Sequence, residues 1–356
     1  MIFAKSRRDR PIPRGLITDF FEPHRLHANQ NDKKPLNWQS WCIMSMTNMY
    51  HVLLIIAPLF LIIFASAVLQ RLKLIGENWS QVLNEFALKI GLPVLIFSAL
   101  SKVAPSFSEQ SELIVFNSCF VLGSFLLAYL VGKALRLKKQ SLLTLFICLA
   151  FSNIAYLGIP VLTQIQGEKI LPVASLIVAI YLFWVFTVGT GYLDYATSTN
   201  KRNIAKNMAL NLVKSPLIIA VVLGILVSLL RITLPAVLIK PLDMITASVT
   251  PTVLVVIGLF IGKSTIGKWS DWLPVFSFSV ATLIIMPAIF YFSVKLLGYS
   301  PSTFSASMIE AAMPLAITPF ALADKYNLNK DFIARSIVLS TVLSVISLPF
   351  WISILQ

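Results

Sequence analysis

Long stretches without a charged residue constrain this chain more than any other feature. No Lys, Arg, Asp or Glu occurs in residues 52–70, 113–132, 140–167, 170–193, 244–262 and 272–294. Each stretch has about the 20 residues that a helix needs to cross a hydrocarbon core roughly 30 Å thick. Of the 356 residues, 57% are apolar and only 12% are charged, so the sequence predicts an integral membrane protein and excludes a soluble fold.

We predict an all-α integral membrane fold of about ten transmembrane helices. They are expected at residues 51–70, 82–101, 113–133, 142–164, 170–193, 212–230, 238–262, 272–297, 303–323 and 333–354. The widest polar break, residues 194–214, divides these spans five and five. The expected organisation is therefore a polar basic tail (1–49), a first five-helix repeat (50–194), a cytoplasmic linker (195–211) and a second five-helix repeat (212–356).

Prolines recur at matching places in the two halves. Pro93 in helix two matches Pro251 in helix seven, and Pro160 in helix four matches Pro319 in helix nine. Because each repeat has an odd number of spans, the two enter the membrane from opposite sides, as in many secondary carriers. We therefore predict two inverted repeats, with Pro93 and Pro251 supporting helix breaks.

The loops predict the orientation of the chain. Most Lys and Arg of the loops lie in the odd-numbered loops, and the opposite side, without the N-terminal tail, carries only Lys102, Lys169, Arg231, Lys240 and Lys295. Since cytoplasmic loops are rich in Lys and Arg, both termini are expected outside a cell inner (plasma) membrane.

The first 43 residues are basic and would resist export. The favoured explanation is that translation begins at Met44, Met46 or Met49 and that the upstream stretch is an artefact of gene-start assignment. A cytoplasmic tail with inverted topology and a truly exported tail remain alternatives.

Helices four and nine carry helix breakers in the middle of an apolar run. Helix four contains Asn153, Gly158 and Pro160, and helix nine contains Pro314 and Pro319. Irregular backbone at membrane depth is tolerated only against protein or a water-filled cavity. If both helices unwind and cross, their N-terminal ends present N–H donors and partial positive charge to an anion. This pattern favours a carboxylate substrate.

These segments also carry a family resemblance. Residues 153–162, 310–314 and 319–327 resemble the auxin efflux carrier family, which includes plant PIN auxin carriers and bacterial malate and malonate permeases. The resemblance implies a fold like that of bile-acid symporters and sodium/proton antiporters. It implies a scaffold of helices one, two, six and seven and a transport domain of helices three to five and eight to ten. The crossover asparagine of the family maps onto Asn153, and its crossover prolines map onto Pro160 and Pro319.

Other polar residues inside the spans have candidate roles. The Asn153 amide is suited to binding a carboxylate, Tyr156 is a candidate to close the pocket, and Gly158 and Pro314 lie within the broken segments. Glu310, about one turn from the break, is the candidate carrier of a coupling proton. For Asn153, Tyr156 and Glu310, capping, packing and a place at the water-exposed rim are the respective alternatives.

The function that follows is a secondary active transporter of small organic anions, such as malate, working by alternating access. Alternatives are a sodium-coupled bile-acid-type symporter and a non-transporting membrane ligand sensor. The expected partners are an organic anion, the lipid bilayer and a proton or sodium ion, with a homodimer left open and no nucleic acid. The three Cys and three His lack metal-ligand spacing and no catalytic constellation is visible, so no metal, cofactor or enzymatic activity is expected.

Overall fold

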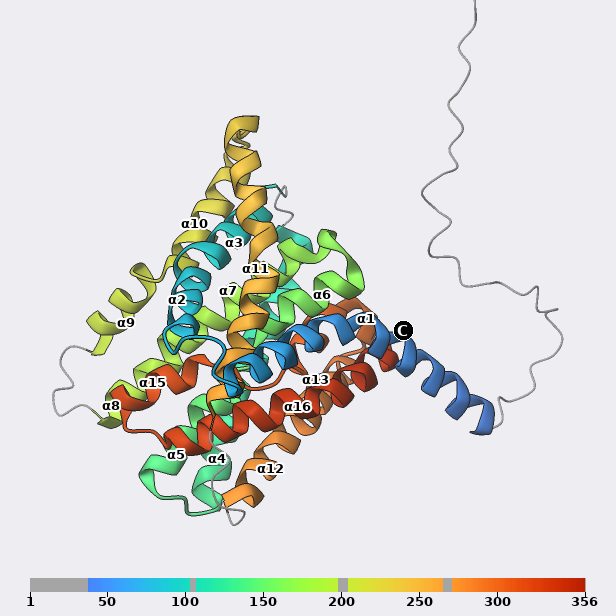
Figure 1. Cartoon of the computed structure of the whole chain (residues 1–356), viewed down its shortest axis with the longest axis vertical. Helices are drawn as coiled ribbons and strands as arrows, with labels where there is room; N and C mark the ends of the chain where they lie inside the picture. Colours follow the sequence, from blue (N-terminus) through green and yellow to red (C-terminus); the bar gives the residue numbers. More distant parts are fainter. Residues whose placement is uncertain (1–37, 103–106, 198–203, 265–270, 356) are drawn as a thin grey trace, which may run out of the picture. The chain divides into compact units, whose positions relative to one another are not determined.

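The computed structural model describes residues 38–102, 107–197, 204–264 and 271–355 (Figure 1). The chain divides into one unit that ends at Met44 and a second that runs from Ser45 to the C-terminus. Of the predicted basic tail, residues 1–49, residues 1–37 lie outside the described residues, and residues 38–49 are helical. The description below concerns the second unit.

The described residues are almost entirely helical. The first half of the chain contains α1 (Trp38–Arg71), α2 (Trp79–Phe86), η1 (Ala87–Gly91), α3 (Leu92–Ser101), α4 (Phe107–Ala134), α5 (Lys139–Leu149), η2 (Ile154–Gly158), α6 (Ile159–Gln166), η3 (Glu168–Ile170), α7 (Leu171–Trp184), η4 (Val185–Gly189) and α8 (Thr190–Thr197). The second half contains α9 (Ile204–Val213), α10 (Pro216–Leu229), α11 (Ala236–Lys263), α12 (Trp272–Val280), η7 (Ala281–Ile285), α13 (Met286–Leu296), η8 (Pro301–Phe304), α14 (Ser305–Ala311), α15 (Thr318–Tyr326) and α16 (Lys330–Leu355).

Within the described residues, 7 helical runs are long and apolar enough to cross a membrane. They cover residues 47–71, 79–101, 111–134, 168–197, 236–263, 272–296 and 330–355. The prediction of an all-helical membrane protein is therefore confirmed. The other three predicted spans, at 142–164, 212–230 and 303–323, contain shorter helices, two of them interrupted, and the count of ten spans stays a prediction.

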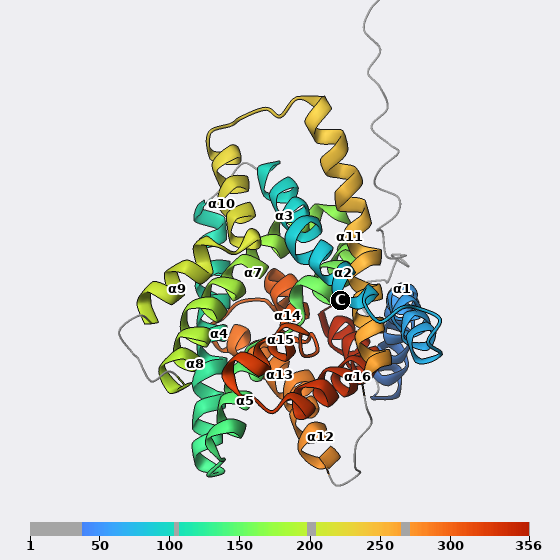
Figure 2. The ribbon, with the colours of Figure 1, turned by 60° about the vertical axis from the view of Figure 1, so that its left-hand side comes forward.

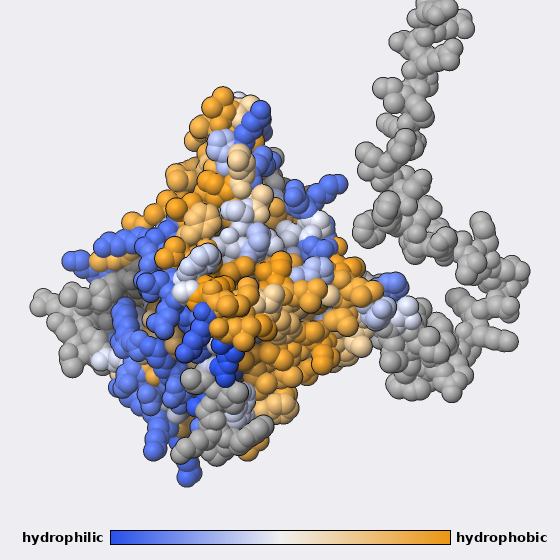
Figure 3. All heavy atoms as spheres, in the orientation of Figure 1, coloured by the Kyte–Doolittle hydropathy of each residue, from blue (hydrophilic) through white to orange (hydrophobic). Residues whose placement is uncertain are grey.

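The surface shows where lipid and water contact the protein. Large apolar side chains are exposed on several helices, including Leu61 (66% exposed), Leu130 (54%), Phe292 (64%) and Ile346 (68%). In Figure 3 the strip over α1 and α16 is hydrophobic, whereas hydrophilic residues gather over the ends of α5, α8 and α15. Apolar exposure on this scale needs lipid around it, because water would penalise it.

The helices pack in two groups. In the first helix group, defined as α1–α3, α10 and α11, α3 packs on both α10 and α11 (Figure 2). In the second helix group, defined as α4–α7 and α12–α16, α4 packs on α5 and α7, α12 packs on α16, and α13 packs on α14. Helix α7 also contacts α3 and α10, so it lies where the two groups meet.

Two glycines bring α1 and α11 into close contact. A Cβ at Gly258 would lie 2.2 Å from the carbonyl oxygen of Ile63, and one at Gly262 would lie 2.5 Å from that of Ala67. Four residues apart, these glycines share one face of α11. Small residues at this spacing let helix backbones approach closely in membranes.

The prolines expected to support helix breaks, Pro93 and Pro251, both lie in helices. Pro251 lies inside the continuous helix α11, and Pro93 is the second residue of α3, directly after the π-helical turn η1. A proline removes one donor and bends a helix, but neighbouring helices and local π turns can satisfy the groups that it frees. The predicted linker, 195–211, contains the end of α8 and most of helix α9.

Candidate functional site

The segments predicted as helices four and nine are both interrupted near their middle. Helix α5 ends at Leu149 and η2 begins at Ile154, while α14 ends at Ala311 and α15 begins only at Thr318. Pro160 and Pro319 are the second residues of α6 and α15. Proline is well suited to the first turn of a helix, which is the place of Pro319 in α15. Pro160 instead follows the π-helical turn η2 without a break, so this helix restarts at Ile154, directly after Asn153.

The two interruptions pair with each other. Asn153 donates its backbone N–H to the carbonyl of Pro314 at 2.7 Å, and Ala316 donates to the carbonyl of Phe151 at 3.0 Å. Between these two bonds lies an isolated antiparallel β-bridge of Ser152 with Leu315. Backbone N–H and C=O groups that the broken helices leave without helical partners thus bond to the opposite segment. Backbone groups at membrane depth need such partners, because lipid cannot supply them.

The pairing uses N–H groups that the sequence suggested for anion binding. The N–H of Asn153 and that of Ala316 bond to carbonyls in the crossing, and the N–H of Leu315 donates to the Oγ of Ser340 in α16 at 3.2 Å. These three N–H groups are therefore not available to a ligand, and the Asn153 carboxamide is a side-chain donor at the crossing whose Nδ2 has no partner.

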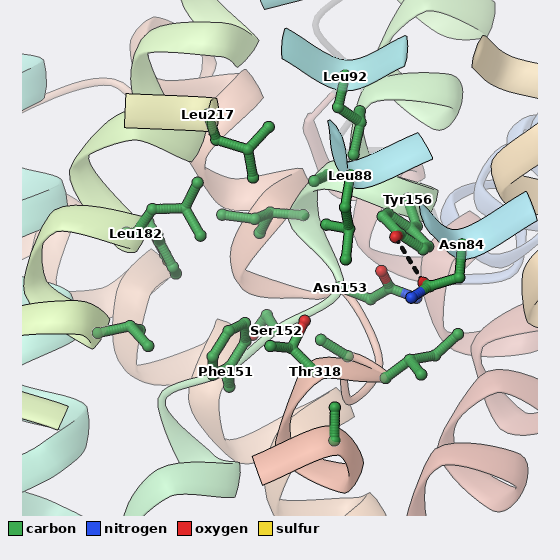
Figure 4. A pocket seen from close by; sticks show the side chains of 17 residues that line it. Asn84, Leu88, Leu92, Phe151, Ser152, Asn153, Tyr156, Leu182, Leu217 and Thr318 are labelled. Atoms are coloured by element: carbon green, nitrogen blue, oxygen red, sulfur yellow. Dashed lines mark hydrogen bonds between the residues drawn. The ribbon is translucent and has the colours of Figure 1, made fainter. Parts of the chain in front are cut away.

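A cavity of about 80 Å³ lies against the crossing. It is lined by residues 151–156, 316–318 and 321 of the broken segments, by Tyr181, Leu182 and Val185, by Asn84, Leu88 and Leu92 of α2–α3, and by Leu217 of α10 (Figure 4). A buried water occupies roughly 10–15 Å³ of such space, so the cavity has room for a small organic molecule. None of these described lining residues carries a charge.

Asn153 and Tyr156 supply polar groups to this cavity. Asn153 is 3% exposed, and its Nδ2 is buried with no hydrogen-bond partner. Tyr156 donates its hydroxyl to Oδ1 of Asn84 at 2.8 Å (Figure 4). An unpartnered buried amide is costly by roughly 1–3 kcal/mol, which a bound ligand with an acceptor oxygen would relieve.

Glu310 lies behind the crossing and does not line the cavity. It is fully buried in α14, and neither carboxyl oxygen has a hydrogen-bond partner within the described structure. A Cβ at Gly158 would lie 3.4 Å from the Glu310 carboxyl carbon, so this carboxyl packs against the broken helix four. Tyr181 lines the cavity, and its buried hydroxyl has no hydrogen-bond partner in the described structure.

The remaining predicted residues shape the crossing and do not line the cavity. Gly158 leaves room for the Glu310 carboxyl, and Pro314 supplies a carbonyl to the pairing. Pro160 and Pro319 are the second residues of α6 and α15. Sequence reasoning did not identify Asn84, the polar residue that α2 contributes. Asn84 lies close to Gln81, Glu85 and Lys89 in the sequence, so no local signal set it apart from its polar neighbours.

Comparison with known proteins agrees with this architecture. Residues 51–352 match the family described as membrane transport proteins. The chain belongs to this family. The auxin efflux carrier resemblance noted in helices four and nine is thereby confirmed, and the family and its relatives are membrane transporters and not enzymes.

Three relatives illustrate the family. An uncharacterized transporter of Methanocaldococcus jannaschii is 26% identical over 84% of this chain and 96% of its own length. A putative malonate transporter of Rhizobium meliloti is 22% identical over 82% of this chain and 92% of its own length. Auxin efflux carrier component 8 of Arabidopsis thaliana is 21% identical over 85% of this chain and 96% of its own length.

Proposed function

We propose that this membrane transporter is a secondary carrier of small organic anions, with its substrate site in the cavity at the crossing. The observation that carries the proposal is the Asn153 side chain, whose Nδ2 is buried at the cavity without a partner. A carboxylate oxygen is the strongest acceptor that an organic substrate offers to such a donor. The relatives named for malonate and auxin support an acidic substrate.

The lining favours a substrate with one negative charge over malate. Apart from its amides and hydroxyls, the cavity is walled by leucines, valine and phenylalanine, and no Lys or Arg faces it among the described lining residues. A second carboxylate would be buried without a partner, and this would reduce the free energy of binding by about several kcal/mol. A small carboxylate with an apolar remainder therefore suits this cavity best.

The proposed mechanism is alternating access. The cavity lies between α2, α3 and α10 of the first helix group and the crossing segments of the second. Ten spans in two inverted repeats, with the first helix group fixed and the second moving, would expose the crossing to each side in turn. From the excess of Lys and Arg in the odd-numbered loops we infer that both termini lie outside a cell inner membrane.

Glu310 is the proposed carrier of a coupling proton. A fully buried carboxyl without a partner is stable only as the neutral acid or beside a cation, and Glu310 packs against Gly158 of the broken helix four. A substrate carboxylate arriving at Asn153 would bring negative charge toward Glu310. Proton uptake by Glu310 and anion binding would then favour each other.

Transport assays with purified protein in sealed vesicles test the proposal. Radiolabelled malate, malonate and several monocarboxylates are offered with an imposed pH gradient, an imposed sodium gradient or neither. We expect accumulation of a monocarboxylate that depends on the pH gradient. Accumulation driven by sodium alone would show a sodium symporter instead, and binding without accumulation of any of these acids would show a ligand sensor.

A further inference from the structure

Asn84 stands out because it is the polar group on an otherwise aliphatic wall. The first helix group lines the cavity with Asn84 and with Leu88, Leu92 and Leu217. In Figure 4 the side chains of Asn84, Asn153 and Tyr156 gather on the same side of the cavity. The Asn84 amide lines the cavity together with these leucines.

Tyr156 fixes which end of that amide faces the cavity. Its hydroxyl donates to Oδ1 of Asn84 at 2.8 Å, so the carboxamide oxygen is already in use. The amide nitrogen still carries two N–H donors. On the same side of the cavity, Nδ2 of Asn153 is a buried donor without a partner (Figure 4). Two amides, one from each helix group, thus lie side by side at the cavity, and a carboxylate has two oxygens to accept their N–H groups.

The bond of Tyr156 with Asn84 joins helices of different groups. By contrast, the bond of Asn117 with Ser307 lies within the second helix group, and that of Lys102 with Asp243 lies within the first. A movement that carries α2 away from the crossing would separate Asn84 from Tyr156 and from Asn153.

We propose that Asn84 is a substrate-binding residue that holds one oxygen of the carboxylate while Asn153 holds the other. Tyr156 is then a positioning residue, because it acts through the Asn84 amide. This inference rests on the proposed function and extends it. In the orientation described here the carboxylate has donors from both helix groups, and when the groups separate it keeps only Asn153, so the substrate is released more readily on the other side.

Asn84→Asp separates binding from a purely structural role. Asp keeps an acceptor for the Tyr156 hydroxyl but removes the N–H donors and puts negative charge beside the substrate carboxylate. We expect Asn84→Ala to weaken the Kd of the transported carboxylate by roughly ten- to a hundredfold, and Asn84→Asp to weaken it further. Asn84→Asp should also bind the primary amide analogue of that substrate better than the acid, which inverts the wild-type preference.

The matched control is Asn78→Asp, the same change at an exposed position of the same helix region, which should leave both affinities within twofold. Wild-type affinity for the acid in Asn84→Asp would overturn the proposal. If Asn84→Asp fails to fold, Asn84→Ala is compared with Tyr156→Phe. A larger loss in Asn84→Ala supports substrate binding, and equal losses overturn it.

The binding measurements distinguish an error in the role of Asn84 from an error in the proposed function. If the full-length wild-type protein binds a carboxylate and the Asn84 variants bind it equally well, the role of Asn84 is wrong and the proposed function stands. If the wild-type protein binds no carboxylate of the panel, both are wrong.

Discussion

The carbonyl oxygen of Pro314 accepts the backbone N–H of Asn153 at 2.7 Å, which ties the break in one helix directly to the break in the other. Proline cannot donate, but its carbonyl accepts like any other. The residue that helps to open helix nine therefore also anchors helix four. The geometry of the cavity depends on this junction, because residues on both sides of it line the wall.

Ser340→Ala should destabilise the crossing. The Ser340 hydroxyl is the acceptor for the buried N–H of Leu315, and losing it leaves that N–H unsatisfied at a cost of about 1–3 kcal/mol. We expect a lower apparent melting temperature of the purified protein in detergent. Ser353→Ala, near the exposed end of the same helix, is the control and should melt like the wild type.

Gly258→Ala should disrupt the contact of α1 with α11. The new Cβ would lie 2.2 Å from the carbonyl oxygen of Ile63, and backbone cannot move aside as a flexible side chain can. Reduced yield and a broadened peak in size-exclusion chromatography are expected. The comparison is Gly123→Ala in α4, where nothing lies within 4 Å of the added atom. Equal behaviour of the two variants would contradict the close approach.

Asn153→Ala should weaken carboxylate binding. A hydrogen bond to a charged group contributes about 1.5–3 kcal/mol, so the apparent affinity should fall by roughly ten- to a hundredfold. Equilibrium binding of the transported acid to purified protein measures the effect. Ser302→Ala, an exposed position before helix nine, should bind like the wild type. Unchanged affinity in a well-folded Asn153→Ala protein would remove the anion site from the crossing.

Glu310→Gln should uncouple transport from protons. The amide preserves the shape of the buried side chain while removing the group that takes up a proton. We expect exchange of labelled for unlabelled substrate to continue, because it needs no net proton movement, and accumulation driven by a pH gradient to be lost. Glu168→Gln, at an exposed turn, should keep both activities. Intact pH-driven accumulation in Glu310→Gln would exclude Glu310 as the carrier.

The proposed topology places the C-terminus outside the cell. The loops that carry most Lys and Arg are expected in the cytoplasm, and the last helix, α16, ends at Leu355. A C-terminal phosphatase fusion should be active and a C-terminal green fluorescent protein fusion dark. The reverse pair of results would invert the orientation.

The sequence predicted the helical membrane fold and the two interruptions because their causes are local. An uncharged run of membrane length forms a helix, and Asn, Gly and Pro together in its middle break it. A proline without such neighbours does not reliably predict a helix break. Pro251 lies within a continuous helix, since surrounding structure satisfies the groups that it frees. The place of Asn84 was not predictable, because it depends on how α2 packs against the crossing and not on its neighbours in sequence.

The crossing is joined by main-chain bonds at Phe151, Asn153, Pro314 and Ala316. Main-chain bonds are available to almost any residue type. Side chains facing the cavity can therefore be exchanged during evolution while the crossing itself persists. A descendant protein could acquire a new substrate through a few substitutions among the cavity residues and keep the same fold.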